Sequence, residues 1–118
     1  MPPTMDQLLR RHAERSAPNE CVGALLGHGD DLVEALELLN ASPTPRTSFE
    51  LSASEYLRAE RHAASRGLQV LGFYHSHVDA PAVPSARDLE HAASFARLLI
   101  LSVRAGKAEA PVEWPTHT

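Results

Sequence analysis

Apolar residues recur at helical spacing in three segments of the chain. Met5, Leu8, Leu9 and Ala13 follow this spacing near the start, and Thr4 with Gln7 forms a capping box ahead of them. Further helices are predicted from the capping box of Ser52 and Glu55 to Gly67, and from Ser85 through Leu89, Ala92, Ala93 and Ala96. The pattern therefore predicts helices over residues 5–16, 53–66 and from 85 onward.

Apolar runs between these segments predict strands. The runs cover residues 21–27, 68–74 and 98–103, with shorter candidates near Phe49 and over residues 110–114. Residues 31–39 are ambiguous, because their leucines fit helical spacing while their alternation fits the second strand of a hairpin. We favour the strand. Residues 41–48 contain Pro43, Pro45 and several hydroxyl residues, which predicts a loop.

Composition places the chain among compact globular domains. It has 118 residues and a mass of 12.8 kDa, of which 43% are hydrophobic and 22% charged, so residues 1–118 are expected to form one domain. The net charge of −4 argues against a nucleic-acid partner. Cys21 is the single cysteine, which excludes an intramolecular disulfide and any zinc site built from cysteine pairs.

The apolar stretches are too short for a membrane-spanning segment. The longest, at residues 22–26 and 98–101, fall far below the roughly 20 residues that a spanning helix needs. Charged residues interrupt residues 1–18, so no secretory signal is indicated. We therefore expect a cytoplasmic protein with no membrane partner.

His75 and His77 are the strongest candidates for chemistry. Residues two apart on a strand point to the same face, so both imidazoles should meet at the strand's end. Asp88, in the first turn of the predicted third helix, could supply a third ligand to a zinc ion with one open position. Zinc hydrolysis also needs a base, for which Glu20, at the mouth of the first strand, is the candidate.

Each of these residues also has a structural interpretation. His75 and His77 could be an exposed pair, and Ser85 with Asp88 an ordinary helix cap. Capping and chemistry could coexist at Ser85 and Asp88. Several other residues are expected to have packing, structural or surface roles: His12, His28, His62, Ser76, His91, His117 and the buried Cys21.

Together, these residues resemble a known motif. His75, Ser76 and His77, followed by Ser85 and Asp88, with Glu20 upstream in a Glu-Cys-Val-Gly-Ala-Leu-Leu-Gly strand, resemble the JAMM motif of the Mov34/MPN/PAD-1 metalloproteases. The resemblance spans residues 5 to about 103 and is closest to the short prokaryotic branch, leaving a short C-terminal tail. Val78 stands where many relatives have proline, which removes no ligand.

The resemblance implies a fold and an activity. The fold would be one layered α/β domain, a curved mixed β-sheet flanked by α-helices, as in MPN and cytidine-deaminase-like proteins. His75, His77 and Asp88 would bind one zinc ion per chain, Glu20 would activate water and Ser85 would stabilise the oxyanion. The substrate would be a ubiquitin-like or sulfur-carrier protein, cut after its C-terminal Gly-Gly.

Two other functions are consistent with part of the pattern. Scaffold members of the same superfamily bind ubiquitin-like proteins without catalysis, but they typically lose metal ligands, whereas this chain has all of them. A zinc deaminase shares a related fold, but the chain lacks the Pro-Cys-x-x-Cys ligands of that class. The metallopeptidase is therefore favoured.

Overall fold

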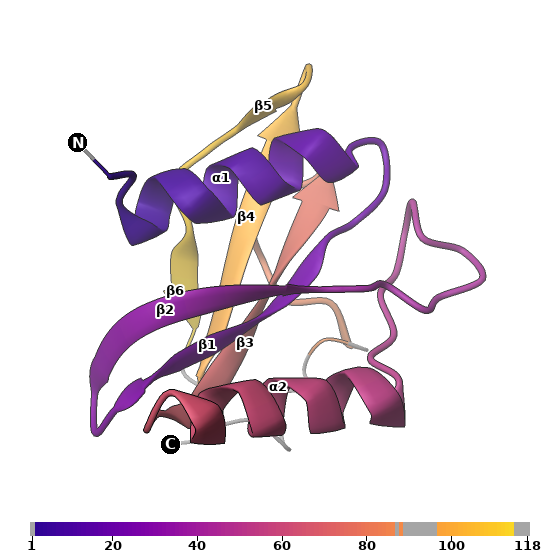
Figure 1. Cartoon of the computed structure of the whole chain (residues 1–118). Coiled ribbons are helices and arrows are strands. Elements are labelled where there is room, and N and C mark those ends of the chain that lie inside the picture. The colour runs from indigo at the N-terminus through magenta and orange to yellow at the C-terminus, as the bar shows by residue number, and fades with distance from the viewer. Residues whose placement is uncertain (1, 87, 89–96, 115–118) are drawn as a thin grey trace.

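Two helices cover opposite faces of one β-sheet (Figure 1). The computed structural model describes residues 2–86, 88 and 97–114. Helix α1 (Met5–Ser16) lies across one face, and α2 (Ala53–Ser65) lies along the other. The predicted α/β layering is confirmed, and no described helix is long and apolar enough to cross a membrane.

The sheet is mixed, as expected. Its strand order is β2-β1-β3-β4-β5, and β6 also pairs with β4. Antiparallel ladders join β1 to β2 and β3, whereas β3 and β4 run parallel. The strands are β1 (Val22–His28), β2 (Asp31–Leu38), β3 (Gln69–Val78), β4 (Leu98–Arg104), β5 (Lys107–Ala108) and β6 (Val112–Trp114).

The core is divided between the two faces by the alternation of side chains along each strand. Tyr74 of β3 packs with Leu9 and Ala13 of α1, while its neighbour Phe73 packs in the second cluster with Ala59 of α2. By the same alternation Ser76 faces the α1 side, and His75 and His77 face the opposite side. The histidines therefore lie on the α2 face, at the end of β3.

Capping side chains define the helix ends. Thr4 and Gln7 form the predicted capping box of α1. Ser52 accepts a hydrogen bond from the Glu55 N–H at the start of α2, but the Glu55 carboxylate turns to the Leu39 N–H, 2.6 Å away, so the second predicted box is half formed. Gly67 follows α2 with φ of +68°, the left-handed conformation expected after a helix end.

The strand interpretation of residues 31–39 is confirmed by β2, which pairs with β1 over seven of its eight residues. The strand predicted near Phe49 is wrong. Residues 40–50 instead satisfy their backbone through Asn40, whose Oδ1 accepts from the N–H groups of Ser42 and Glu50. A side chain has replaced a neighbouring strand as the hydrogen-bonding partner.

The C-terminal region contains more strand than predicted. β5 was missed, because two residues carry no periodic signal; it forms a hairpin with β4 through Ala105 and Gly106, both with positive φ. Within the predicted segment 110–114, β6 covers the last three residues. Of the predicted third helix, Ala86 and Asp88 are helical, and the remainder, with His91, lies outside the described residues.

Candidate functional site

The end of β3 brings two imidazoles together. The Nε2 atoms of His75 and His77 lie 3.3 Å apart, as the two-residue spacing predicts. His75 is almost fully buried, and its ring packs on that of Phe49 with 4.5 Å between centroids. Phe49 is thus not part of a strand, and its ring packs against that of His75.

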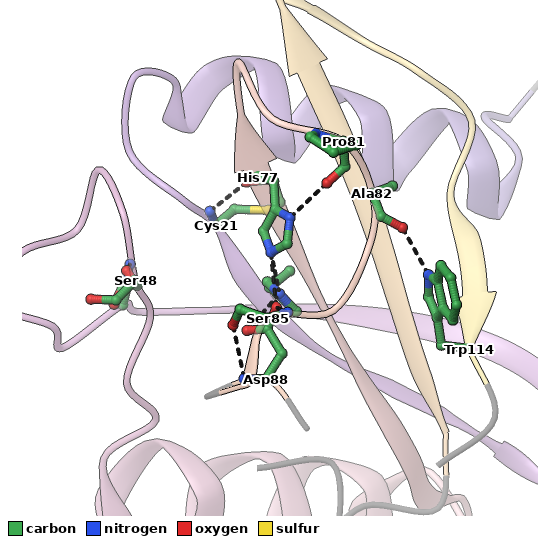
Figure 2. Close-up of polar contacts among 11 residues, drawn as sticks. Cys21, Ser48, His77, Pro81, Ala82, Ser85, Asp88 and Trp114 are labelled. Atoms are coloured by element: carbon green, nitrogen blue, oxygen red, sulfur yellow. Dashed lines mark hydrogen bonds and ion pairs between the residues drawn. The ribbon is translucent and has the colours of Figure 1, made fainter. Parts of the chain in front are cut away.

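Asp88 reaches both histidines from the segment that follows β3 (Figure 2). Its Oδ2 lies 2.9 Å from His77 Nε2, and its Oδ1 lies 3.2 Å from His75 Nε2. Asp88 Oδ2 also accepts from the Ser85 N–H, while Ser85 Oγ accepts from the Asp88 N–H at 3.0 Å. The reciprocal cap and the histidine contacts are therefore made by the same two residues.

The orientation of His77 is set by a backbone carbonyl. Its Nδ1 lies 2.9 Å from Pro81 O, and because a carbonyl can only accept, Nδ1 carries the proton (Figure 2). Nε2 lies 2.9 Å from Asp88 Oδ2 and donates to it when the ring is protonated; when the ring is neutral, with its proton on Nδ1, Nε2 carries the lone pair. This is the tautomer that a metal ligand needs.

Glu20 lies two residues before the start of β1 and is held there by its backbone. Its N–H donates to Pro45 O at 2.7 Å, and its carbonyl accepts from Asn40 Nδ2 at 3.0 Å. The side chain is buried, and its carboxylate lies with the nitrogens of His75 and His77 in a group whose ligand atoms are all within 4.8 Å of one another.

The pKa values of the two carboxylates at the site shift in opposite directions. Burial raises the pKa of Glu20 to about 7, against the opposing effect of nearby His77. Burial also acts to raise the pKa of Asp88, but hydrogen bonds from His75, His77 and the Ser85 N–H outweigh it and hold this pKa well below its usual range. Asp88 is thus a fixed anion, whereas Glu20 can gain or lose a proton near neutral pH.

The donor set fits a metal ion. Ligand atoms bound at about 2.0–2.1 Å to one tetrahedral ion stand roughly 3.3 Å apart. The contacts among His75, His77 and Asp88, at 2.9 to 3.3 Å, are close to that spacing before any ion is considered. Glu20 is the alternative carboxylate in the group, but its raised pKa makes it the poorer ligand and the better proton carrier.

A pocket of about 260 Å³ opens onto this cluster. One side consists of candidate site residues, and the other includes the loop over residues 41–48. The lining residues are Glu20, Arg46, Thr47, His77, Val78, Ala80, Ser85 and Asp88. A substrate entering this pocket would contact four of the five predicted site residues.

Three residues expected to be structural do pack in this way. Ser76 Oγ accepts from the Cys21 N–H at 2.8 Å, on the face opposite the two histidines. His12 lies on the buried side of α1, with Nδ1 2.7 Å from the Tyr74 hydroxyl. Cys21 is buried, and burial raises the pKa of its thiol to about 11, which leaves it a protonated core residue.

Three residues at the site were not anticipated from the sequence. Asn40 ties the loop to Glu20, Pro81 orients His77, and Arg46 lines the pocket. Asn40 could have been noticed as an amide residue at a strand end, a frequent turn former. The other two act through loop geometry and carry no local signal.

The chain is similar in sequence to two curated proteins. The chain is 36% identical over 83 residues to a Thermus thermophilus protein named "Probable TtuB-protein conjugate cleaving protease", and 35% identical over 85 residues to a Haloferax volcanii desampylase. Each match covers 70% of this chain, which spans 55% and 61% of the two relatives. The chain thus spans little more than half the length of the curated relatives it matches.

Solved structures are similar over nearly the whole chain. A protein from Salinibacter ruber matches 94% of this chain and 76% of its own, with a TM-score of 0.67 and 39% identity. A JAB1/MPN domain protein from Archaeoglobus fulgidus matches 92% of this chain and 82% of its own, with a TM-score of 0.61 and 20% identity. At that identity the second match shows the shared fold alone.

A family model gives the broadest match. The model describes prokaryotic homologs of the JAB domain and matches residues 2–116 of the 118 in the chain. The fold agrees with it, since a JAB1/MPN domain is among the similar structures. The chain therefore belongs to the prokaryotic JAB-domain family.

Proposed function

We propose that this protein is a zinc-dependent peptidase or isopeptidase that hydrolyses the amide bond after the C-terminal Gly-Gly of a ubiquitin-like or sulfur-carrier protein. The convergence of His75, His77 and Asp88 beside Glu20, in one pocket with Ser85, carries the proposal. The names of the Thermus and Haloferax relatives support the substrate class.

His75, His77 and Asp88 would hold the metal. Two neutral imidazoles and one carboxylate are a donor set that suits zinc and leaves a position open. Zinc held there would supply a Lewis acid that polarises the substrate carbonyl and lowers the pKa of water toward neutrality. Asp88 stays ionised, and Pro81 O holds the Nδ1 proton of His77, so Nε2 is the nitrogen that would bind the metal once it has lost its own proton.

Glu20 would act as the general base and then as the general acid. Its carboxylate lies beside the two histidines, and its pKa of about 7 lets it accept a proton from the attacking water at neutral pH. The same carboxyl group would then deliver that proton to the leaving nitrogen. The hydrogen bonds of its backbone to Pro45 and Asn40 hold the side chain in place.

Ser85 would stabilise the negative charge that develops on the substrate carbonyl oxygen. Its Oγ accepts from the Asp88 N–H, and a hydroxyl that accepts one bond still has its own proton to donate. The side chain is exposed at the pocket, where that proton can reach a substrate oxygen. The cap also fixes the position of the hydroxyl.

A Gly-Gly tail suits this pocket on steric grounds. The space is about 260 Å³ and is bordered by the side chains of Thr47, Val78 and Ala80. Glycine has no side chain to accommodate and adopts extended or turned backbone with equal ease. Bulkier residues on the acyl side would be excluded.

The direct test is intact-mass analysis of zinc-loaded protein incubated with small ubiquitin-like carriers extended past Gly-Gly. We expect cleavage directly after the second glycine. Glu20→Gln is the matched control, because it keeps the shape and the metal ligands but cannot take up a proton; we expect it to bind one zinc per chain and to lose about 10²–10⁴-fold in activity.

Two results would contradict the proposal. Full activity of the Glu20→Gln variant would contradict the assignment of Glu20 as the general base. No cleavage of any carrier by protein that holds one zinc per chain would remove the substrate class.

A further inference from the structure

The pocket contains one cationic side chain that the proposed chemistry does not use. Arg46 lies on the loop over residues 41–48 and lines the pocket opposite the histidine and carboxylate cluster. The loop, marked by Ser48, and the His77–Asp88 pair are both visible in Figure 2. The proposed hydrolysis already has its base and its oxyanion donor. These two roles therefore do not explain why an arginine lines the pocket.

Arg46 has no ion-pair partner among the described residues. Most other arginines in that part of the chain pair with carboxylates, at positions 10, 15, 58, 66, 97 and 104. Of the two carboxylates that line the pocket with Arg46, Asp88 is paired with the two histidines and Glu20 lies within 4.8 Å of their nitrogens. The charge of Arg46 is therefore available to a ligand.

The loop that carries Arg46 is held firmly against the site. Pro45, the preceding residue, accepts a hydrogen bond from the Glu20 N–H. Asn40 Nδ2 donates to both Glu20 O and Ser48 O, and the Ser42 and Ser48 hydroxyls lie 2.6 Å apart. The backbone of Arg46 thus has a set distance from the candidate base, so the side chain can position a substrate relative to the scissile bond.

We propose that Arg46 is a specificity-determining residue that binds a carboxylate of the substrate close to the scissile bond. The inference rests on the proposed function. A guanidinium binds a carboxylate through two parallel hydrogen bonds, a geometry that neutral amides of the peptide chain do not match. The preferred substrates would be those whose leaving amine carries a carboxylate within one residue.

That carboxylate has two chemical sources. It is the α-carboxylate when a single amino acid follows Gly-Gly, and it is an acidic side chain when the tail is joined to a lysine beside Asp or Glu. One substrate pair tests each source. For the α-carboxylate, the pair is a one-residue extension as the free acid and as the carboxamide. For the acidic side chain, the pair is a lysine-linked peptide with Glu or with Gln next to the lysine.

The test compares kcat and KM for these pairs in the zinc-loaded parent, Arg46→Ala and Arg46→Lys. We expect at least one acid substrate to be favoured about tenfold, mainly through KM, as charge-assisted hydrogen bonds contribute. Arg46→Ala should abolish the preference and Arg46→Lys should keep part of it. Arg61→Ala, which removes the same charge from the exposed surface of α2, should leave the preference unchanged.

Equilibrium binding separates this inference from the proposed function. Glu20→Gln protein should bind the favoured acid more tightly than its neutral partner by the same factor, and Glu20→Gln/Arg46→Ala should not. Equal affinities, or a preference that survives in Arg46→Ala, would overturn the role of Arg46 whether or not the parent cleaves. Cleavage of acid and neutral substrates at equal rates would leave the peptidase standing and remove this inference.

Discussion

His12 and His77 lie on opposite faces of the same sheet, and their surroundings differ in an instructive way. His12 contacts the Tyr74 hydroxyl at 2.7 Å, and its nearest carboxylate, Glu37, is 3.9 Å away and already paired with Arg15. Burial lowers the pKa of His12. Burial acts to lower the pKa of His77 as well, but the hydrogen bond to Asp88 at 2.9 Å, the hydrogen bond to Pro81 and the charges of Asp88 and Glu20 together outweigh it and raise this pKa.

A neighbouring cavity does not distinguish the two histidines. One of about 400 Å³ borders His12, and the smaller one of about 260 Å³ borders His77. The difference lies in convergence, because a second imidazole and the Asp88 carboxylate meet at His77, whereas a phenol and a carboxylate paired with Arg15 surround His12. A buried histidine therefore indicates chemistry only when other ligand atoms converge on its free nitrogen.

The largest expected effect comes from removing the carboxylate beside His77. Asp88→Asn should lower metal content from one ion per chain to a small fraction and reduce activity about 10³-fold or more, because several kcal/mol of transition-state stabilisation depend on the ion. Glu37→Gln makes the matching change beside His12 and should keep both. Metal analysis with turnover assays checks this; a fully loaded, fully active Asp88→Asn protein would contradict it.

Ser85 offers a test of capping against chemistry. Ser85→Gly should lose about 10²-fold in kcat, as expected for one oxyanion donor, while costing only a few tenths of a kcal/mol in stability. Ser85→Thr, which keeps the hydroxyl, should retain most of the activity. Steady-state kinetics and chemical denaturation on both variants check this, and a Ser85→Gly enzyme with unchanged kcat would leave the serine only its capping role.

Ser76 lies between the two histidines in sequence but belongs to the opposite face. Ser76→Ala leaves the buried Cys21 N–H without its hydroxyl acceptor and should lower the free energy of unfolding by about 1–3 kcal/mol. Metal content should not change. Ser65→Ala, at the exposed end of α2, is the control and should stay within about 0.5 kcal/mol. Denaturant titration with metal analysis distinguishes the two faces.

The smallest expected effect is a pH dependence contributed by His12. Burial lowers its folded-state pKa below the ordinary histidine value of 6.5, so the unfolded chain takes up a proton that the folded chain resists. Stability should therefore fall as the pH drops through about 6.5 toward the folded-state pKa. In denaturation curves recorded with a chelator at pH 7.5 and 5.5, His12→Gln should lose less stability than the parent; an equal or larger loss would contradict the assignment.

Local pattern accounts for much of the fold and of the site. The Thr4 capping box, the Gly67 helix end and the apolar runs of β1, β3 and β4 each depend on neighbours in sequence, and all were predicted. The strand expected near Phe49 and the missed β5 show where such reasoning fails. Near Phe49 the backbone bonds to the Asn40 side chain within its own loop, and the two residues of β5, paired with β4 across a tight turn, are too few to show a period.

For the site, the sequence by itself determined what lies within one strand or one turn. His75 and His77 share a face because side chains alternate along β3, and Ser85 reaches Asp88 because residues three apart meet at a helix start. Only the tertiary structure decided that Glu20 and Asp88 both converge on the two histidines, and that Arg46 lines the same pocket. Those positions depend on β1, β3 and the 41–48 loop packing together, and contacts between such distant segments are set by the whole core.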